Sequence, residues 1–345
     1  MDIAERRERV LRHTAEAVTT DELDALLTER DRPHVYIGYA PTGEMHIGHF
    51  TTIRKIVDFL AADLDVTVLI ADLHAHLDDE KSPFDLLEAR SEYYRRGIEA
   101  MVRAAGGKAG DINFVNGSAF ELDPPYTLDL YRLAAETTTT RAKRAGSEVV
   151  REQEHPTVGS LLYPLMQALD VDALDADIAY GGIDQRGIYM LAREILPNLS
   201  GDKPICLFAP LLSGLEGGKM SASERTSAVW LTDSREAVEE KVGAAYCPAG
   251  EREENGILEY LEYLVFPAML ADDPFVVERP EEYGGTLSYD SYDGLEAEFL
   301  SGELHPADLK PAAADGIADL IEPVRKELLE HPTLLSEAYP ERYEN

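Results

Sequence analysis

The sequence contains few cysteines and no long apolar run. Of its 345 residues only Cys206 and Cys247 are cysteines, and they form neither a disulfide framework nor the spacing of a metal site. No stretch of about 18 apolar residues occurs, and no basic segment precedes an apolar run at the N-terminus. We therefore expect a protein without a membrane span that is not secreted and works in a reducing cytoplasm.

Positive charge is also scarce. Asp and Glu number 66 against 32 Lys and Arg, of which only 9 are Lys, and the formal net charge is −34. The acidic residues are dispersed through a chain that is 44% hydrophobic, which argues against disorder as their explanation. Such a surface repels itself in dilute salt and is screened in molar salt, so it indicates a very salty cytoplasm. An ordinary acidic protein kept soluble by its charge is the alternative.

Apolar runs alternate with helical patterns over the first two thirds of the chain. Such alternation predicts an α/β fold with a parallel, Rossmann-like sheet covered by helices on both faces. The expected strands are 34–39, 65–72, 111–115, 176–181 and 204–209, and the expected helices are 47–62, 84–105, 126–145, 157–170 and 184–196.

The two ends of the chain have a helical pattern. An amphipathic helix is expected over 1–30, with buried positions at Ile3, Val10, Leu11, Val18, Leu23 and Leu27. From 233 onward the pattern is mainly helical, with apolar positions at Val238, Val242, Leu258, Leu261 and Leu264. We expect an N-terminal helical segment (1–33), a Rossmann-like domain (34–232) with a hinge loop at 212–224, and a helical C-terminal domain (233–345).

The segment 36–50, YIGYAPTGEMHIGHF, places two histidines at a strand-to-helix turn. Ligands bind at such turns in parallel sheets, and a helix N-terminus favours anions. Gly48 would let a nucleotide lie on the backbone, while His46 and His49 could hydrogen-bond phosphate oxygens. Taken alone, the pair could equally be ordinary surface or core histidines.

A second stretch, 217–223, supports the nucleotide interpretation. It is a glycine-rich loop, GGKMSAS, whose lysine and hydroxyls suit a polyphosphate. HIGH followed far downstream by KMSAS resembles the paired ATP-binding motifs of class I aminoacyl-tRNA synthetases. The order and separation of the two motifs are more specific than either motif alone.

The segment 160–174, SLLYPLMQALDVDAL, carries a polar line on an apolar helix. Tyr163, Gln167 and Asp170 are spaced i, i+4 and i+7, and a buried unpaired carboxylate is costly. They either satisfy one another internally or line a ligand cavity. The strand that follows ends in GGIDQR (181–186), another turn at the same edge of the sheet.

Several motifs together resemble the tyrosyl-tRNA synthetases of the archaeal and eukaryotic type, from about Val35 to Leu328. They are YIGYAPTGEMHIGH, ADLHAHL, LYPLMQALD, GGIDQR, KMSAS, AYCPAG, YGG and GELHPADLK. The resemblance implies that the tyrosine phenol is held by Tyr36 and Asp170. It implies contacts to the α-amino group for Tyr163, Gln167 and Gln185, with His74 close to the pocket.

The resemblance also implies a two-step reaction with ATP. The tyrosine carboxylate attacks the α-phosphate and releases pyrophosphate, and the tyrosyl group then passes to tRNA(Tyr). This chemistry depends on positioning and charge stabilisation, with Mg²⁺ accompanying ATP and no protein metal site expected. The implied catalytic residues are His46, His49, Lys219, Ser221 and Ser223, and the implied ATP contacts are Gly38, Gly48, Asp184 and Met220.

Recognition of tRNA is implied at two places. Arg144 and Arg186 match the arginines that contact the first acceptor base pair, and Tyr283 and Asp308 match the residues at the wobble guanine. The alternatives are structural: an ion pair of Arg186 near Asp184, a core position for Tyr283, and a helix N-cap at Asp308. The family is homodimeric, and a subunit with this charge would need salt to pair.

Three other functions stay open on the sequence. Tryptophanyl-tRNA synthetases share the fold and both motifs, although Asp170 beside Tyr36 and the segment GELHPADLK favour tyrosine. A synthetase-derived RNA-binding protein would not need the intact motifs, and a coenzyme nucleotidyltransferase would not need the helical C-terminal region. Ala222 departs from the more common KMSKS and KMSSS forms, which puts in doubt how many side chains hold pyrophosphate.

Overall fold

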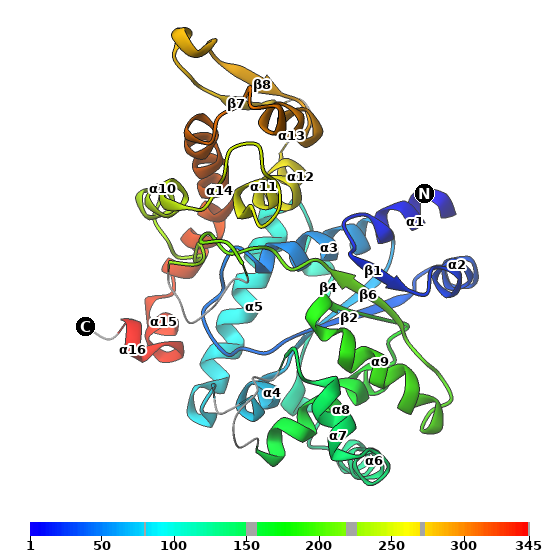
Figure 1. Cartoon of the computed structure of the whole chain (residues 1–345). Helices are drawn as coiled ribbons and strands as arrows, with labels where there is room; N and C mark the ends of the chain where they lie inside the picture. The colour runs from blue at the N-terminus through cyan, green and yellow to red at the C-terminus, as the bar shows by residue number, and fades with distance from the viewer. Residues whose placement is uncertain (79–80, 150–156, 219–225, 270–272, 344–345) are drawn as a thin grey trace.

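The computed structural model describes residues 1–78, 81–149, 157–218, 226–269 and 273–343 (Figure 1). A six-stranded sheet lies in its N-terminal part, with strand order β1-β6-β5-β2-β3-β4. All pairings except β1 with β6 are parallel, which confirms the expected α/β fold. The parallel strands are β2 (His34–Tyr39), β3 (Asp65–Ile70), β4 (Ile112–Asn116), β5 (Ile178–Gly182) and β6 (Ile205–Ala209).

Alternate residues of the strands enter two cores on opposite faces of the sheet. In β2, Val35 and Ile37 pack in the core that contains α3 (His49–Ala61) and α5 (Leu87–Ala104). Tyr36 between them belongs to the other core. Figure 1 shows α3 and α6 to α9 on opposite sides of the sheet. The helices of that second side are α6 (Pro124–Glu136), α7 (Thr139–Ala145), α8 (Val158–Ala173) and α9 (Arg186–Ile195).

The prediction of a single helix over residues 1–30 is wrong. The structure has α1 (Ile3–Leu11), β1 (Glu16–Val18) and α2 (Thr20–Glu29). The chain leaves the helix at Arg12, whose backbone is extended, and the Thr19 side chain caps α2. Between them β1 pairs antiparallel with β6 and so covers an edge of the sheet. Of the expected buried positions, Val10, Leu23 and Leu27 are buried, Leu11 and Val18 are partly exposed, and Ile3 is exposed.

Two further boundaries differ from the prediction. The helix expected over 126–145 is two helices, because the chain is extended at Thr137 and Thr138 and the Thr138 side chain caps α7. The strand expected over 65–72 ends at Ile70, since α4 (Asp72–Leu77) begins two residues later. The turn into α4 brings the 72–77 segment to the carboxyl edge of the sheet.

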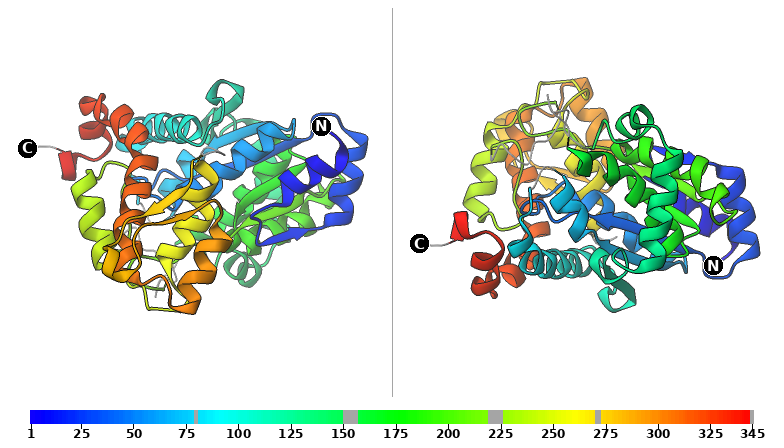
Figure 2. Two further views of the ribbon diagram at one scale, coloured as in Figure 1. Left: turned by 90° about the horizontal axis from the view of Figure 1, so that it is seen from above. Right: turned by 90° about the horizontal axis from the view of Figure 1, so that it is seen from below.

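The C-terminal region is mainly helical and also contains a two-stranded antiparallel sheet, which the sequence reasoning did not anticipate. Helix α14 packs against α5 and α10. Figure 2 shows this helical region at one end of the molecule and the N-terminus at the other. The elements are α10 (Arg235–Ala244), α11 (Gly256–Tyr260), α12 (Phe266–Ala268), β7 (Phe275–Val277), β8 (Leu287–Tyr289), α13 (Tyr292–Ser301), α14 (Pro306–Leu329), α15 (Pro332–Ala338) and α16 (Pro340–Tyr343). Among the described helices, none is long and apolar enough to cross a membrane.

Candidate functional site

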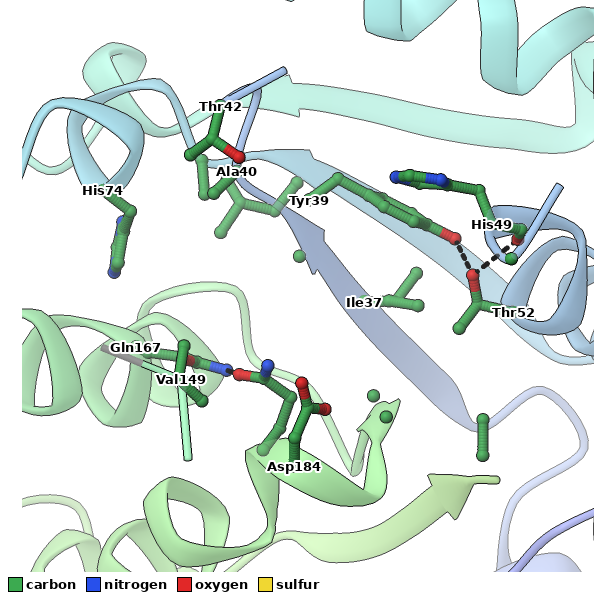
Figure 3. A pocket seen from close by; sticks show the side chains of 18 of the residues that line it. Ile37, Tyr39, Ala40, Thr42, His49, Thr52, His74, Val149, Gln167 and Asp184 are labelled. Atoms are coloured by element: carbon green, nitrogen blue, oxygen red, sulfur yellow. Dashed lines mark hydrogen bonds between the residues drawn. The ribbon is translucent and has the colours of Figure 1, made fainter. Parts of the chain in front are cut away.

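A cavity of about 380 Å³ opens at the carboxyl ends of the parallel strands (Figure 3). It extends from the turn between β2 and α3 to the polar face of α8. The sequence-derived candidates that line it are Tyr36, Gly38, His46, Gly48, His49, His74, Tyr163, Gln167, Asp170, Asp184 and Gln185. The fold therefore gathers the candidates for both nucleotide and amino acid into one site, as expected for the edge of a parallel sheet.

The turn that carries the two histidines is held from both sides. The His46 Nδ1 accepts from the Gly48 amide at 3.2 Å, and the His49 Nδ1 lies 3.2 Å from the amide nitrogen and 3.1 Å from the carbonyl oxygen of His46. The turn also pairs with a second segment, in which the amide of Ile47 donates to the Val229 carbonyl at 2.8 Å. In the described part of the chain, no recorded hydrogen bond uses either Nε2 atom, so both are available to a ligand.

Both histidines are neutral at pH 7. Desolvation lowers the pKa of His49 to about 4, and desolvation together with the neighbouring His49 ring lowers the pKa of His46 well below its ordinary value. The two rings meet edge to face with centroids 4.5 Å apart. Since its Nδ1 accepts a backbone N–H, the neutral His46 ring carries its proton on Nε2 and can donate to an anion there, whereas the His49 Nδ1 lies between a backbone N–H and a backbone carbonyl, so its contacts do not assign its tautomer.

Two glycines, Gly38 and Gly182, lie on the side of the cavity where a nucleotide is expected. A Cβ at Gly38 would lie 3.7 Å from Tyr36 Cε2 and 3.9 Å from Leu69, which are ordinary packing distances. The protein itself therefore does not require glycine at this position, whereas a ligand lying on the strand would. Asp184 lines the same side at the end of β5, where a Cβ at Gly182 would meet its carboxylate at 2.5 Å.

The side of the cavity formed by α8 has a buried polar wall. The hydroxyl of Tyr36 accepts from Tyr189 at 3.3 Å and faces the Gln167 carbonyl at 3.5 Å. Gln167 donates to the Gln185 side chain at 2.9 Å, which joins α8 to the turn after β5 (Figure 3). Asp170 is only 1% exposed, and burial together with the Glu121 carboxylate raises its pKa well above the ordinary range.

Three residues at this wall were missed by the sequence reasoning. Tyr126 on α6 donates its hydroxyl to Asp170 Oδ1 at 2.7 Å, and Tyr189 on α9 donates to Tyr36. The buried Glu121 follows β4 and faces His74. The position of Glu121 just after a strand was the available signal, because carboxyl ends of parallel strands share one edge. Nothing in the sequence distinguishes Tyr126 and Tyr189 from ordinary core tyrosines.

One group in the described part of the chain could place three ligand atoms around a cation: His74, Glu121 and Asp170, within 4.8 Å of one another. The sequence prediction named no metal site. The two nitrogens of His74 face different carboxylates, Nδ1 toward Glu121 at 3.4 Å and Nε2 toward Asp170 at 3.5 Å. One cation cannot bind both nitrogens, so this geometry favours an ionic chain over a chelate.

The two arginines that are expected to contact tRNA are exposed, and both lie where the end of α7 meets the start of α9. Arg144 is near the end of α7, and Arg186 begins α9. A Cβ at Gly187 would come 2.5 Å from the Ala145 carbonyl, so the two helix ends touch. Arg186 forms an ion pair, as one structural alternative predicted, and its partner is Glu16 on β1. The guanidinium donates to the two carboxylate oxygens of Glu16, from Nε at 2.6 Å and from Nη2 at 2.9 Å.

The structural alternatives for the expected anticodon residues are wrong. Tyr283 is 64% exposed in the turn between β7 and β8, so it is not a core aromatic. The N-cap of α14 is His305, and Asp308 lies in the first turn of that helix. The Arg279 guanidinium donates to the carbonyls of Gly285 and Glu303, which ties the Tyr283 turn to the segment before α14.

Four candidates cannot be placed. Lys219, Met220, Ser221 and Ser223, the expected pyrophosphate loop, lie outside the described residues.

The arrangement of the cavity indicates a class of protein. A parallel sheet with a paired-histidine turn at one end of a cavity, and a buried polar pocket at the other, is what a class I tRNA synthetase requires. A model of the family "tRNA synthetases class I (W and Y)" matches residues 28–322. The chain belongs to this family, which confirms the resemblance inferred from the motifs.

Individual relatives agree with the family assignment. The chain is 68% identical to a tyrosine–tRNA ligase of Natronomonas pharaonis over the full length of both, and 67% identical to that of Haloarcula marismortui over 99% of both. These relatives come from halophilic archaea, which matches the expected salty cytoplasm. A crystal structure of tyrosyl-tRNA synthetase complexed with L-tyrosine from Archaeoglobus fulgidus is similar, with a TM-score of 0.88 and 42% identity over 95% of this chain and all of that one.

Proposed function

We propose that the chain acts as a tyrosine–tRNA ligase in translation. It activates L-tyrosine with ATP to tyrosyl-adenylate and pyrophosphate, and then transfers the tyrosyl group to the 3′ end of tRNA(Tyr). The observation that carries this proposal is a buried carboxylate, Asp170, and a buried phenol, Tyr36, in the wall of a cavity that opens beside the histidine turn. The names of the relatives at 68% and 67% identity support tyrosine over tryptophan.

Asp170 and Tyr36 select tyrosine through its hydroxyl group. The phenol of the substrate donates to the Asp170 carboxylate and completes the hydrogen bonding of Tyr36. Phenylalanine would leave these buried polar groups without a hydrogen-bond partner. The free-energy cost of that is far larger than the cost of losing the apolar contacts of one methylene group. Tyrosyl-tRNA synthetases are the standard example, with a discrimination of about 10⁵ against phenylalanine. Tyr163, Gln167 and Gln185 hold the α-amino group, and His74 stands behind Asp170.

The histidine turn serves the phosphates. The neutral His46 donates from Nε2 to the phosphates as charge develops during attack of the tyrosine carboxylate, and His49 contacts them beside it. Gly38 and Gly48 leave room for the nucleotide, and Asp184 contacts the ribose. Lys219, Ser221 and Ser223, with Met220 beside the nucleotide, close over the pyrophosphate, and Mg²⁺ travels with ATP as part of the substrate.

Recognition of tRNA uses both halves of the chain. Arg144 and Arg186 contact the first acceptor base pair, since both are exposed beside the touching ends of α7 and α9. The exposed Tyr283 stacks on the wobble guanine, and Asp308 accepts a hydrogen bond from it. The helical region from 233 onward then acts as the anticodon-binding domain, and the reaction takes place in the cytoplasm.

The chain works as a homodimer. Support comes from three large apolar side chains exposed on one segment: Leu122 before α6, and Leu128 and Tyr131 within it. Leu128 and Tyr131 are three residues apart and so share one face of the helix. Exposed apolar residues gathered on one element are typical of an interface. Since each subunit carries a net charge of −34, association requires screening salt.

The proposal is tested by amino-acid-dependent exchange of pyrophosphate into ATP, in molar KCl, with each of the twenty amino acids. Exchange with tyrosine alone, followed by charging of tRNA(Tyr), is the expected result. Exchange with tryptophan would keep the mechanism and overturn the role of Asp170. A folded sample that supports no exchange, yet binds tRNA, would make the chain an RNA-binding relative of the synthetases.

A further inference from the structure

Three ionisable side chains from different elements form a chain behind the tyrosine pocket. His74 of α4 lies between Glu121, which follows β4, and Asp170 of α8, and all three side chains are at most 1% exposed. The His74 Nδ1 is 3.4 Å from Glu121 Oε1, and its Nε2 is 3.5 Å from Asp170 Oδ2. A carboxylate thus faces each nitrogen of the imidazole.

Glu121 depends on His74 for its charge compensation. Both Glu121 oxygens are buried without a hydrogen-bond partner among the described residues, and a Cβ at Gly117 would lie only 2.3 Å from Oε1. In the part of the chain that the structure describes, His74 is the one basic side chain recorded within ion-pair distance of it. An uncompensated buried carboxylate is strongly unfavourable, so this position requires a positively charged imidazole.

The surroundings of His74 favour that charge. Burial opposes protonation, but the carboxylates of Glu121, Asp170 and Asp72 outweigh it and raise the pKa of His74 to about 9. Asp72, on the same helix, is occupied by hydrogen bonds from the Ser118 amide and hydroxyl. The remaining neighbour is the Tyr163 ring, edge on at 4.8 Å. At pH 7 His74 is therefore an imidazolium, and a carboxylate oxygen lies within ion-pair distance of each of its nitrogens, at 3.4 and 3.5 Å.

Asp170 has a neighbouring group at each oxygen, a hydrogen-bond donor at one and an ion-pair partner at the other. Its Oδ1 accepts from Tyr126, and its Oδ2 faces the His74 Nε2–H. Burial and Glu121 raise the pKa of Asp170 well above its ordinary value, which favours the protonated carboxyl, whereas His74 and Tyr126 act in the opposite direction and favour the ionised form. An ionised carboxylate has about four lone-pair sites, so two donors leave capacity for a third, the substrate hydroxyl.

We propose that Glu121 and His74 are positioning residues for tyrosine selection: Glu121 holds His74 as an imidazolium, and His74 keeps Asp170 an ionised, oriented acceptor for the phenol. The inference rests on the proposed role of Asp170 and extends the specificity site to two residues that do not touch the substrate hydroxyl. It assigns a function to Glu121, a carboxylate that otherwise has no reason to be buried.

The experiment compares Glu121→Gln, which keeps shape and removes charge, with Glu136→Gln, which removes an exposed carboxylate from the end of α6. Tyrosine- and phenylalanine-dependent pyrophosphate exchange is measured in molar KCl. Glu121→Gln is expected to raise the KM for tyrosine about tenfold and to narrow the preference over phenylalanine, with the KM for ATP unchanged. Glu136→Gln is expected to match the wild type.

The pH profile separates this role from a structural one. In the wild type, kcat/KM for tyrosine should fall as pH rises through about 9, because His74 loses its proton there. Without the Glu121 charge the imidazolium is less favoured, so the fall should move to lower pH in Glu121→Gln. The amino group of tyrosine titrates equally in both enzymes and cannot cause a shift between them.

A wild-type measurement needs no folded variant. The ¹⁵N resonances of His74, assigned through bonds, should be those of an imidazolium at pH 7, and a neutral ring would overturn the proposal. An unshifted profile with unchanged KM in Glu121→Gln would also overturn it. So would inhibition by micromolar Zn²⁺, competitive with tyrosine and relieved by Glu121→Gln, because the cluster would then be a metal site. Loss of tyrosine-dependent exchange in the wild type would instead refute the proposed function.

Discussion

Asp170 is the residue whose substitution most directly tests substrate selection. Asp170→Asn keeps an oxygen that can accept from Tyr126 and removes the carboxylate that faces His74 and, in the proposed function, accepts from the substrate hydroxyl. A hydrogen bond to a charged group contributes about 1.5–3 kcal/mol, so kcat/KM for tyrosine should fall roughly 10- to 150-fold. The measurement is amino-acid-dependent exchange with tyrosine and phenylalanine. A variant that kept the wild-type preference for tyrosine would refute the role of Asp170.

Gly38 allows ligand space to be separated from protein packing. Its added Cβ would meet Tyr36 and Leu69 at ordinary distances, so Gly38→Ala should leave the free energy of unfolding within about 1 kcal/mol of wild type. If the nucleotide lies on this strand, the KM for ATP should rise about tenfold, equivalent to about 1.4 kcal/mol. Gly110→Ala, which adds a Cβ in open space, is the matched control. An unchanged KM for ATP would place the nucleotide elsewhere.

At the residue scale, the sequence predicted the side chains that carry a spacing or a motif. Tyr163, Gln167 and Asp170 line the cavity because their helical spacing puts them on one face. Glu121, Tyr126 and Tyr189 were missed because their importance depends on which side chain they meet in the folded chain. The same limit applies to Arg186, whose partner Glu16 is 170 positions away in the sequence.

Among the elements, β1 carries the ion-pair partner of Arg186, one of the two arginines proposed to contact the acceptor stem. Glu16 pairs with Arg186 through two hydrogen bonds, and the Arg186 guanidinium lowers the pKa of Glu16, so the carboxylate is ionised at working pH. Because both side chains are exposed, the pair contributes at most about 1 kcal/mol. Because Glu16 and the RNA compete for the same guanidinium, Glu16→Gln should lower the KM for tRNA, by no more than about fivefold, and leave pyrophosphate exchange unchanged. Arg186→Gln should raise the KM for tRNA, and an unaffected value in both variants would exclude Arg186 from tRNA binding.

The last helices of the chain support the loop that leads into the histidine turn. The hydroxyl of Tyr339 donates to the Gly43 carbonyl at 2.7 Å, and the hydroxyl of Tyr343 donates to Glu44 at 2.7 Å. Arg90 joins them, with its guanidinium 4.9 Å from the Tyr339 ring centroid and a hydrogen bond to the Ala338 carbonyl. The last helices therefore hold Gly43 and Glu44, which precede His46 by three and two residues in the sequence.

This contact predicts a specific effect on ATP. Tyr339→Phe removes one buried hydrogen bond, worth about 1 kcal/mol, from the loop before His46. We expect the KM for ATP to rise about fivefold while the KM for tyrosine stays unchanged. Tyr289→Phe is the matched control, since that buried tyrosine of β8 loses one hydrogen bond to Glu298, far along the chain from the turn. If both variants changed the KM for ATP equally, the contact of Tyr339 with Gly43 would contribute only to the general stability of the protein.

The sequence predicted the parallel strands well and the short antiparallel strands poorly. Each parallel strand begins within two residues of its expected start. The central strands β2, β3, β5 and β6 are mostly buried and therefore give continuous apolar runs, and β4 at the edge carries a shorter one. The three-residue β1 carries no such run, and its pairing with β6 is set by the turn at 12–15 and the cap at Thr19. The short β7 and β8 were missed for the same reason.

At the scale of the whole molecule, two electrostatic effects of salt oppose each other. Salt weakens ion pairs, which lowers stability, and it screens the mutual repulsion of excess acidic residues, which raises it. The ion pairs lie at short range, as in Arg95 with Glu92 at 2.7 Å, and so fall within even the Debye length of about 3 Å at 1 M salt. The repulsion acts between dispersed charges, and molar salt removes most of it.

The net charge of −34 therefore decides the sign of the salt effect. We expect the midpoint of thermal unfolding to rise between 0.2 M and 2 M KCl, and the dimer to form in the same range. Circular dichroism measures the midpoint, and light scattering measures the dimer. Excluded solutes also stabilise the folded state, so a sucrose solution of matched osmolality is the control that separates this effect from charge screening. A midpoint that fell with KCl would mean that the ion pairs dominate, and the acidic surface would then need an explanation other than salt.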